Sequence, residues 1–207
     1  MIHQAVAVGP LQCNCHILVD EASKEAVIID PGDDADEILR RVKGYKVLAL
    51  LHTHCHFDHM TGTRKVAEAT GAEILIHKSD KEYYDSLAGQ YRMFGMPRPV
   101  DDPLPVKRFL KDGEQIEFGK HAVKVIHTPG HTQGSCCFHA EGLLISGDTL
   151  FNRSIGRTDL PGGNAAQELE SIRKRLFTLD PETDVFPGHG PQTTIGEERA
   201  ENPFLAG

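Results

Sequence analysis

The sequence predicts an α/β fold in which helices cover β-sheets. Apolar stretches of strand length recur along the chain, short turns join several of them as in hairpins, and amphipathic stretches of helix length separate others. Residues 35–42, which read ADEILRRV, are one such amphipathic stretch. Because a sheet with one apolar face must bury that face, these helices are expected to pack against the sheets.

The apolar and amphipathic stretches give the expected elements in order. Strands are expected near residues 2–8, 15–20, 25–30, 47–51, 73–76, 106–109, 114–118, 121–127, 134–139, 143–146 and 184–187. Helices are expected near residues 33–42, 62–70, 79–88 and 165–178. No Pro/Ser-rich linker or low-complexity tract divides the chain, so residues 1–207 are expected to form a single domain.

Composition and charge exclude several classes of function. The net charge is -8 and Lys and Arg do not cluster, so no nucleic-acid partner is expected. The chain lacks the basic start and apolar segment of a secretory signal, and no uncharged apolar stretch is long enough to cross a bilayer. We therefore expect a cytoplasmic protein without a membrane partner. Its 5 cysteines, an odd number, do not form a disulfide framework.

Residues 54–59 carry the strongest chemical signal. They read HCHFDH, follow the predicted strand at 47–51 and precede the helix expected from residue 62. In an extended loop alternate residues face the same way, so His54, His56 and Asp58 are expected to converge while His59 points elsewhere. This arrangement of imidazoles and a carboxylate predicts a metal site, and the two directions suggest two neighbouring ions.

Three later side chains can complete the coordination of two ions. His131, Asp148 and His189 each lie where a predicted strand gives way to a glycine-bearing turn, a place where a rigid scaffold presents functional groups. The candidate ligands are then His54, His56, Asp58, His59, His131, Asp148 and His189. If Asp148 is shared, each ion has four protein contacts, and zinc, iron and manganese all accept imidazole and carboxylate.

Four motifs in a fixed order resemble those of a known family. They are THCHFDH at 53–59, TPGHTQGS at 128–135, GDTLF at 147–151 and PGHG at 187–190. This set, with the rest of the chain from about residue 2, is similar to the metallo-β-lactamase superfamily and, within it, to the short bacterial glyoxalase II-like (hydroxyacylglutathione hydrolase-like) thioester hydrolases. The resemblance implies an αββα four-layer sandwich with the metals at one edge between the sheets.

The resemblance also implies which residues hold which ion. His54, His56 and His131 would hold the first metal, Asp58, His59 and His189 the second, and Asp148 would bridge them. Zinc is the expected metal, with iron or manganese as substitutes. Two divalent ions, two aspartates and one hydroxide leave a local charge of about +1, which favours an anionic substrate.

Hydrolysis of a thioester such as S-lactoylglutathione follows from the same resemblance. A metal-bridging hydroxide is available at neutral pH because coordination lowers the pKa of water toward about 7. A thiolate whose thiol has a pKa of about 8.5 leaves with little need of a proton donor. Asp58 is expected to position the hydroxide in addition to binding metal. The expected partner is therefore a small-molecule thioester, such as one derived from glutathione.

Weaker signals concern substrate recognition. Arg157 follows Asp148 closely enough to reach a substrate carboxylate. Residues 81–105 are rich in aromatic, Met and Pro residues, and they are expected to form either a lid beside the metals or a packed surface loop. Longer glyoxalase II enzymes bind glutathione partly through a helical C-terminal region. Because this chain ends at residue 207, shortly after His189, a clamp of that kind is not expected.

Three alternative functions use the same donors. A persulfide dioxygenase would hold a single iron through His54, His56 and His131 or through a His/Asp part of the set, and the complete second set of ligands speaks against it. A lactonase or another hydrolase would use the same two ions. A non-catalytic or flavodiiron-like electron-transfer module is disfavoured, because no flavin-binding domain follows and Asp58 and His59 complete a hydrolytic pattern.

Other histidines and the cysteines are expected to be mainly structural. His52 and His127 precede ligand loops and are candidates for orienting a ligand imidazole, although an ordinary role is favoured. His77 ends a predicted strand and is expected to be a hydrogen-bonded edge residue. Cys55 lies between two candidate ligands, and the four remaining cysteines are expected to pack in the core.

Overall fold

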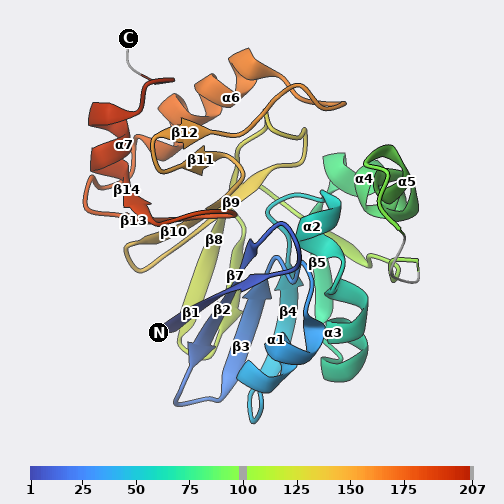
Figure 1. Cartoon of the computed structure of the whole chain (residues 1–207). Helices are drawn as coiled ribbons and strands as arrows, with labels where there is room; N and C mark the ends of the chain where they lie inside the picture. The colour runs from blue at the N-terminus through green and yellow to red at the C-terminus, as the bar shows by residue number, and fades with distance from the viewer. Residues whose placement is uncertain (98–101, 206–207) are drawn as a thin grey trace.

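The computed structural model describes residues 1–97 and 102–205, and two six-stranded sheets form its centre (Figure 1). The first sheet comprises β1 (Ile2–Val8), β2 (Cys13–Asp20), β3 (Glu25–Ile29), β4 (Lys46–Leu51), β5 (Glu73–His77) and β6 (Arg108–Leu110), in that order. Strands β1 to β3 are antiparallel, and β4, β5 and β6 are each added parallel to the preceding strand. Each parallel step requires a crossover connection, and helices occupy these connections.

The second sheet has the order β14-β13-β10-β9-β8-β7. Its strands are β7 (Gln115–Phe118), β8 (His121–His127), β9 (Cys136–Ala140), β10 (Leu143–Gly147), β13 (Asp184–Pro187) and β14 (Thr193–Thr194), and a separate hairpin joins β11 (Leu150–Phe151) to β12 (Ser154–Ile155). Strand β9 is antiparallel to both β8 and β10, and β13 is parallel to β10. Strands β8, β10 and β13 therefore end at the same edge of the sheet.

Helices flank both sheets. Those that follow β3, β4 and β5 are α1 (Ala35–Arg41), α2 (Phe57–Met60), α3 (Thr63–Thr70), the short 3-10 turn η1 (Lys78–Asp80), α4 (Lys81–Asp85) and α5 (Leu87–Met93). The later ones are α6 (Ala165–Ser171), its π-helical continuation η2 (Ile172–Leu176) and α7 (Ile195–Glu201). In Figure 1, α6 and α7 lie on one side of the sheets and α1 and α3 on the other. Within the described residues, no helix is long and apolar enough to cross a membrane.

Alternating side chains along the strands build three cores. On β2, Leu18 packs between the two sheets against residues such as Phe138, whereas the adjacent Ile17 points to the opposite face and packs with Ile38 of α1. On the outer face of the second sheet, Leu144 packs in a third cluster together with buried residues of η2 and α7. Two sheets that share a central core and carry helices on their outer faces make an αββα four-layer sandwich, so the expected fold is confirmed.

The expected strands are confirmed with end points shifted by a few residues, but two of the four helices differ. The helix expected at 79–88 is instead divided into η1, α4 and α5, and the backbone turns at Ser86 between the last two. The helix expected at 165–178 becomes π-helical from Ile172. Helix α7 and the two-residue strands were not predicted, because short polar segments carry little periodicity. Part of the expected lid, residues 98–101, lies outside the described residues.

Candidate metal centre

Four loops meet where strands from both sheets end. The loop after β4 carries residues 52–56 and leads into α2, and the loops after β8, β10 and β13 carry His131, Asp148 and His189. Because β8, β10 and β13 end at one edge of the second sheet, residues far apart in the sequence are brought side by side at that edge. This gathering of strand ends from two sheets is the structural reason that the candidate ligands meet.

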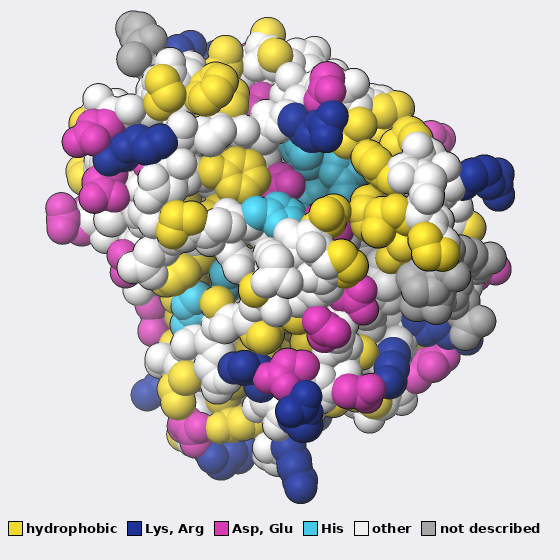
Figure 2. All heavy atoms as spheres, viewed as in Figure 1, with side chains coloured by type: hydrophobic (Ala, Val, Ile, Leu, Met, Phe, Trp, Pro, Cys, Tyr) yellow, Lys and Arg dark blue, Asp and Glu magenta, His cyan; other side chains and the backbone are white. Residues whose placement is uncertain are grey.

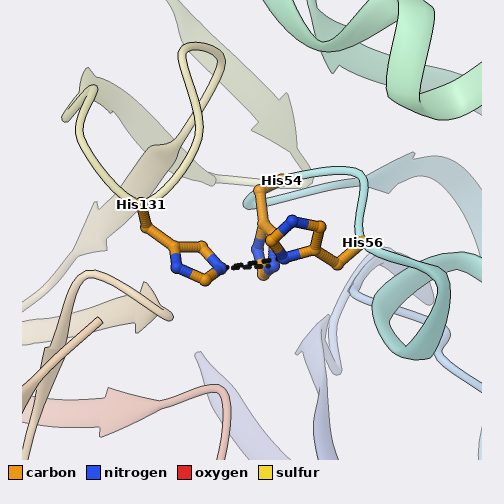
Figure 3. A group of neighbouring side chains, drawn as sticks. All are labelled: His54, His56 and His131. Atoms are coloured by element: carbon orange, nitrogen blue, oxygen red, sulfur yellow. Dashed lines mark hydrogen bonds between the residues drawn. The ribbon is translucent and has the colours of Figure 1, made fainter. Parts of the chain in front are cut away.

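The first group consists of the imidazoles of His54, His56 and His131 (Figure 3). The Nε2 atom of His131 lies 3.2 Å from Nε2 of His54 and 2.9 Å from Nδ1 of His56. Figure 3 shows the three rings converging on one point from two loops. All three side chains are buried, at 2%, 7% and 2% exposure in sequence order.

In each ring of the first group one nitrogen faces the centre and the other faces outward, and a hydrogen bond of the outward nitrogen, where it makes one, fixes where the ring carries its proton. Nδ1 of His131 lies 2.7 Å from the carbonyl oxygen of Arg157, which accepts its proton. Thr53 Oγ1 donates to Asp30 and lies 3.1 Å from Nδ1 of His54, so it accepts from that nitrogen. When the rings of His54 and His131 are neutral, their Nε2 atoms, which face the centre, therefore carry lone pairs and no proton. His56 differs, because it turns Nδ1 inward and its buried Nε2 has no hydrogen-bond partner.

The second group consists of Asp58, His59 and His189. Nε2 of His189 lies 3.1 Å from Oδ2 of Asp58 and 3.3 Å from Nε2 of His59. Nδ1 of His59 donates to Asp30 Oδ2 at 2.9 Å, and Nδ1 of His189 donates to the Leu11 carbonyl at 3.0 Å. Both rings thus present Nε2 to the centre, as His54 and His131 do in the first group.

Asp148 lies between the two groups. One of its oxygens is 3.4 Å from Nε2 of His59, and the other is 3.8 Å from Nε2 of both His131 and His189. Its Oδ1 is buried and lacks a hydrogen bond. Gly188 makes this approach possible, since a Cβ atom there would lie 2.3 Å from Oδ1 of Asp148. The carboxylate is consequently positioned to contact ions in both groups.

The donor set fits two divalent cations. Inward nitrogens that all carry lone pairs repel one another unless a cation or proton lies between them. Two nitrogens bound to one tetrahedral zinc at about 2.0–2.1 Å are separated by roughly 3.3 Å, close to the 2.9 and 3.2 Å spacings of the first group. A donor set of imidazoles and carboxylates without thiolates suits zinc, iron and manganese, and it does not indicate which of the three metals is bound.

Electrostatics differ between the groups. Burial lowers the pKa of His54 well below its ordinary value and that of His56 to about 3, so both rings are neutral at neutral pH. Burial would also lower the pKa of His189, but its hydrogen bond to Asp58 and the charge of Asp148 raise it. Burial opposes ionisation of Asp148, yet His59 and the other nearby imidazoles lower its pKa and keep it anionic. The second group therefore attracts positive charge strongly.

Asp30 supports the centre and was not identified from the sequence. It is fully buried, accepts from Nδ1 of His59 at 2.9 Å and from the backbone and hydroxyl of Thr53 at 2.8 and 2.6 Å. Its backbone lies in the left-handed region with φ 52°, where aspartate is tolerated better than most residues. Asp30 directly follows β3, in the sequence Asp-Pro-Gly, much as Asp148 directly follows β10. This position after a strand is the feature by which the sequence could have identified it.

Two more buried acids hold the ligand loops together. Asp80 accepts from the backbone N–H of Cys55 at 3.0 Å and from that of Gly134 at 2.7 Å, so it ties the two loops of the first group to each other. Glu168 accepts from the backbone N–H of His131 at 2.7 Å, and burial raises its pKa to about 8. Both acids come from helical segments distant in sequence, and no local pattern marks them.

The directions expected for Asp58 and His59 need correction. Asp58 does not converge with His54 and His56, and His59 does not point elsewhere, because the chain turns into α2 at Phe57 and both residues join the second group. The ordinary role favoured for His52 and His127 agrees with the structure, since their side chains bond Thr63 Oγ1 and the carbonyl of Gln133 and not a ligand imidazole.

His77 and the cysteines are structural, as expected, with one difference. His77 lies on β5, an interior strand between β4 and β6, and its ring stacks on that of His127 with centroids 4.0 Å apart. Its Nδ1 accepts from the backbone of Ser79. All five cysteines are buried and free, and burial raises the pKa of each, including Cys55, so the thiols remain protonated.

A cavity of about 490 Å³ opens over the centre. Figure 2 shows histidine side chains at the bottom of a hollow with hydrophobic side chains around its rim. Arg157 contributes to the lining, but its guanidinium is exposed and forms two hydrogen bonds to Asp159, at 2.7 and 2.8 Å. The predicted substrate-binding arginine thus lies at the mouth of the site and already has an anionic partner.

Curated relatives resemble the chain along nearly its whole length. An uncharacterized protein of Mycobacterium leprae is 44% identical, with 96% of each chain covered. The hydroxyacylglutathione hydrolase GloC of Haemophilus influenzae is 36% identical, with 98% of this chain and 97% of the relative covered. The probable metallo-hydrolase YqgX of Bacillus subtilis is also 36% identical, with 97% and 95% covered.

Solved structures share the fold. The BLEG-1 B3 metallo-beta-lactamase matches with a TM-score of 0.91 and 38% identity over 100% of both chains. TTHA1623, solved in a di-iron-bound form, matches with a TM-score of 0.87 and 39% identity over 98% of this chain and 100% of the other. ETHE1 from Myxococcus xanthus matches with a TM-score of 0.81 and 29% identity over 98% and 84% of the two chains.

The family model of the metallo-beta-lactamase superfamily matches residues 8–189, a range that includes every candidate ligand. The fold, the ordered strand-end donors and the relatives agree with that match. The chain belongs to the metallo-beta-lactamase superfamily as one of its metallo-hydrolases.

Proposed function

We propose that this protein is a binuclear metal-dependent thioester hydrolase of the glyoxalase II type, with S-lactoylglutathione or a related acyl thioester as substrate. The observation that carries the proposal is the position of Asp148 between two complete donor groups, within 3.4 to 3.8 Å of imidazoles from both. Two divalent ions held there, most simply zinc, would activate a water molecule and polarise the scissile carbonyl. The 36% identity to GloC supports the choice of a thioester.

Each donor group of this chain has its own role. His54, His56 and His131 would hold the first ion, and His59 and His189 would hold the second together with Asp58. The carboxylate of Asp58 is 15% exposed, so it could both bind metal and accept a hydrogen bond from the attacking water. A substrate seated against the apolar rim would exclude bulk water and strengthen these electrostatic contacts.

Arg157 is the proposed contact for a substrate carboxylate. It lines the same cavity as Asp58 and His131, and a substrate anion would share or replace its pairing with Asp159. A planar guanidinium binds carboxylates through two parallel hydrogen bonds, and the exposed position leaves it free to turn. The thiol half of a glutathione thioester carries such a carboxylate, so we place that half on the Arg157 side of the cavity.

The test is a comparison of two reactions on one preparation with known metal content. Metal-stripped protein is reloaded separately with Zn²⁺, Fe²⁺ or Mn²⁺ and assayed for thiol release from S-lactoylglutathione. We expect thiol release that requires metal and reaches its maximum near two equivalents per chain. The rate should rise with pH and then level off, because the attacking water must lose its proton. No thiol release with any metal would contradict the proposal.

A second candidate is a mononuclear iron dioxygenase acting on a persulfide. The structural similarity to ETHE1, at 29% identity, favours it, as does the first group, which is complete without the second. The same preparation distinguishes the two functions. Oxygen uptake with a persulfide and one equivalent of iron, without thiol release from thioesters, would favour the dioxygenase.

A further inference from the structure

A side pocket adjoins the cavity over the candidate metal centre. It has a volume of about 190 Å³ and shares Leu11, Phe57, Asp58 and Met96 with the central cavity, so the two spaces lie against the same side chains. Its other lining residues come from the end of β1, the β1–β2 connection, the β3–α1 loop, the end of α2, α5 and the segment after α5. Asp58 of the second donor group thus lines both spaces, whereas Arg157 lines only the central cavity.

The wall of the side pocket is apolar and its polar groups are engaged. The ring of Phe57 packs against those of Tyr91 and Phe94, with centroids 5.0 and 5.3 Å apart. Thr61 Oγ1 donates to the Phe57 carbonyl at 2.6 Å and accepts from the Tyr91 hydroxyl at 2.8 Å. These bonds leave neither hydroxyl proton free for a ligand.

Charge restricts the occupant further. Among the residues that the structure describes, those lining the side pocket include the carboxylates of Asp33 and Asp58 and no Lys, Arg or His. An anionic group would be repelled there, and a polar group would find few partners. An uncharged apolar chain fits this lining.

The rim points to the same kind of occupant. Leu11 and Phe94 are large apolar side chains at 50% and 40% exposure, and both line the cavity over the centre. Figure 2 shows hydrophobic side chains next to the visible histidines. A bound apolar chain would remove this surface from water, which supplies binding energy in proportion to the area covered.

We propose that the side pocket binds the acyl chain of the thioester and makes the protein selective for unbranched apolar acyl groups of medium length. The inference rests on the proposed function, because it takes the thiol half to lie near Arg157. The acyl half of the same substrate must then lie on the Asp58 side, where the side pocket begins. At roughly 30 Å³ for a water-sized group, 190 Å³ accommodates about six such groups.

The experiment measures kcat/KM for S-acyl glutathione thioesters with straight chains from acetyl to decanoyl, using metal-loaded wild-type protein. Burying one methylene contributes about 0.8 kcal/mol, which is a factor of about four. We expect kcat/KM to rise about fourfold per methylene up to about six carbons and then to level off. S-Lactoylglutathione, with a hydroxyl on a short chain, should fall well below hexanoylglutathione.

Three variants locate the effect. Met96→Ser and Leu11→Ser should each reduce the gain per methylene to about twofold, measured relative to the same variant's own rate with the acetyl substrate. Met93→Ser is the matched control, because Met93 is 52% exposed at the end of α5, three residues before Met96, and lines neither of these two cavities. It should retain the full wild-type series. Circular dichroism and metal content check that each variant is folded and loaded.

The outcomes separate the two proposals. Thiol release from all members with no dependence on acyl length would overturn this inference and leave the proposed function standing. A gain per methylene that is unchanged in Met96→Ser and Leu11→Ser would place the acyl chain elsewhere and also overturn it. No thiol release from any member would overturn both proposals. A gain of about fourfold per methylene in the wild type and in Met93→Ser, reduced to about twofold in Met96→Ser and Leu11→Ser, supports the inference.

Discussion

The two donor groups of the centre lie side by side but differ in burial and charge. His54, His56 and His131 are almost inaccessible, and burial keeps the first two neutral. In the second group the side chains of Asp58 and His189 are 15% and 27% exposed, and nearby carboxylates raise the pKa of His189. Water can reach the two partly exposed side chains of the second group but not those of the first, so an ion in the second group would exchange faster with solvent although nearby carboxylates attract it. We infer that the second ion dissociates first.

The largest expected effect comes from removing the carboxylate that joins the groups. Asp148→Ala should weaken both ions and lower kcat/KM for a thioester by about a thousandfold or more, equivalent to about 4 kcal/mol. Metal analysis after gel filtration and a thiol-release assay measure the two effects. Asp85→Ala, an exposed carboxylate on α4, is the control. Retention of two equivalents in Asp148→Ala would show that the groups bind independently.

His189→Ala sharpens the difference between the groups. It removes the most exposed ligand of the second group, so we expect one equivalent of metal to remain and kcat/KM to fall about a hundredfold. His131→Ala removes a ligand of the first group instead. Only the ion in the second group should then remain, and dialysis should remove it because it is held more weakly. Titration with a chromophoric chelator distinguishes the two patterns. Equal losses in the two variants would contradict the inferred asymmetry.

Asp30→Asn tests the support beneath the second group. The amide keeps the volume and tolerates the left-handed backbone, but it accepts the His59 Nδ1 proton less strongly than a carboxylate does. Loss of such a partner lowers metal affinity by about 10- to 100-fold, and we expect this decrease in the affinity of the second group, which contains His59. Asp34→Asn is the control, since Asp34 is exposed and has a φ of 46°. Competition with a metal indicator gives both affinities.

The smallest effect concerns a buried imidazole with no proposed ligand role. His16 is 1% exposed, and burial lowers its pKa to about 3 from an ordinary value of 6.5. Because the unfolded chain binds a proton there below pH 6.5 and the folded chain does not, stability should fall as pH drops from 6.5 toward 3. His16→Leu should reduce the slope by up to about 1.4 kcal/mol per pH unit. Urea unfolding at pH 4.5, 5.5 and 6.5 measures it, and an unchanged slope would show that His16 does not titrate on unfolding.

The residue pattern by itself predicted sheets covered by helices, whereas the four layers were implied by the family resemblance. Adjacent apolar residues such as Ile17 and Leu18 on β2 point to opposite faces of the sheet, so a continuous apolar stretch marks a strand that is buried on both faces. The positions of His131, Asp148 and His189 were also readable, because each follows an apolar strand at a glycine turn. Their proximity in space was an expectation that depended on the family resemblance.

The local residue pattern did not determine how the donors are grouped, which the family resemblance had implied, and only the tertiary structure decided how they are supported. The extended pattern at 54–59 predicted the wrong partners for Asp58, because α2 begins at Phe57 and turns the next two side chains toward His189, more than a hundred residues away. Asp30 and Asp80 became visible as supports only through hydrogen bonds to other loops. A side chain's direction at a strand end depends on which other strands end beside it. That pairing is fixed by packing between distant segments, and no local period in the sequence records it.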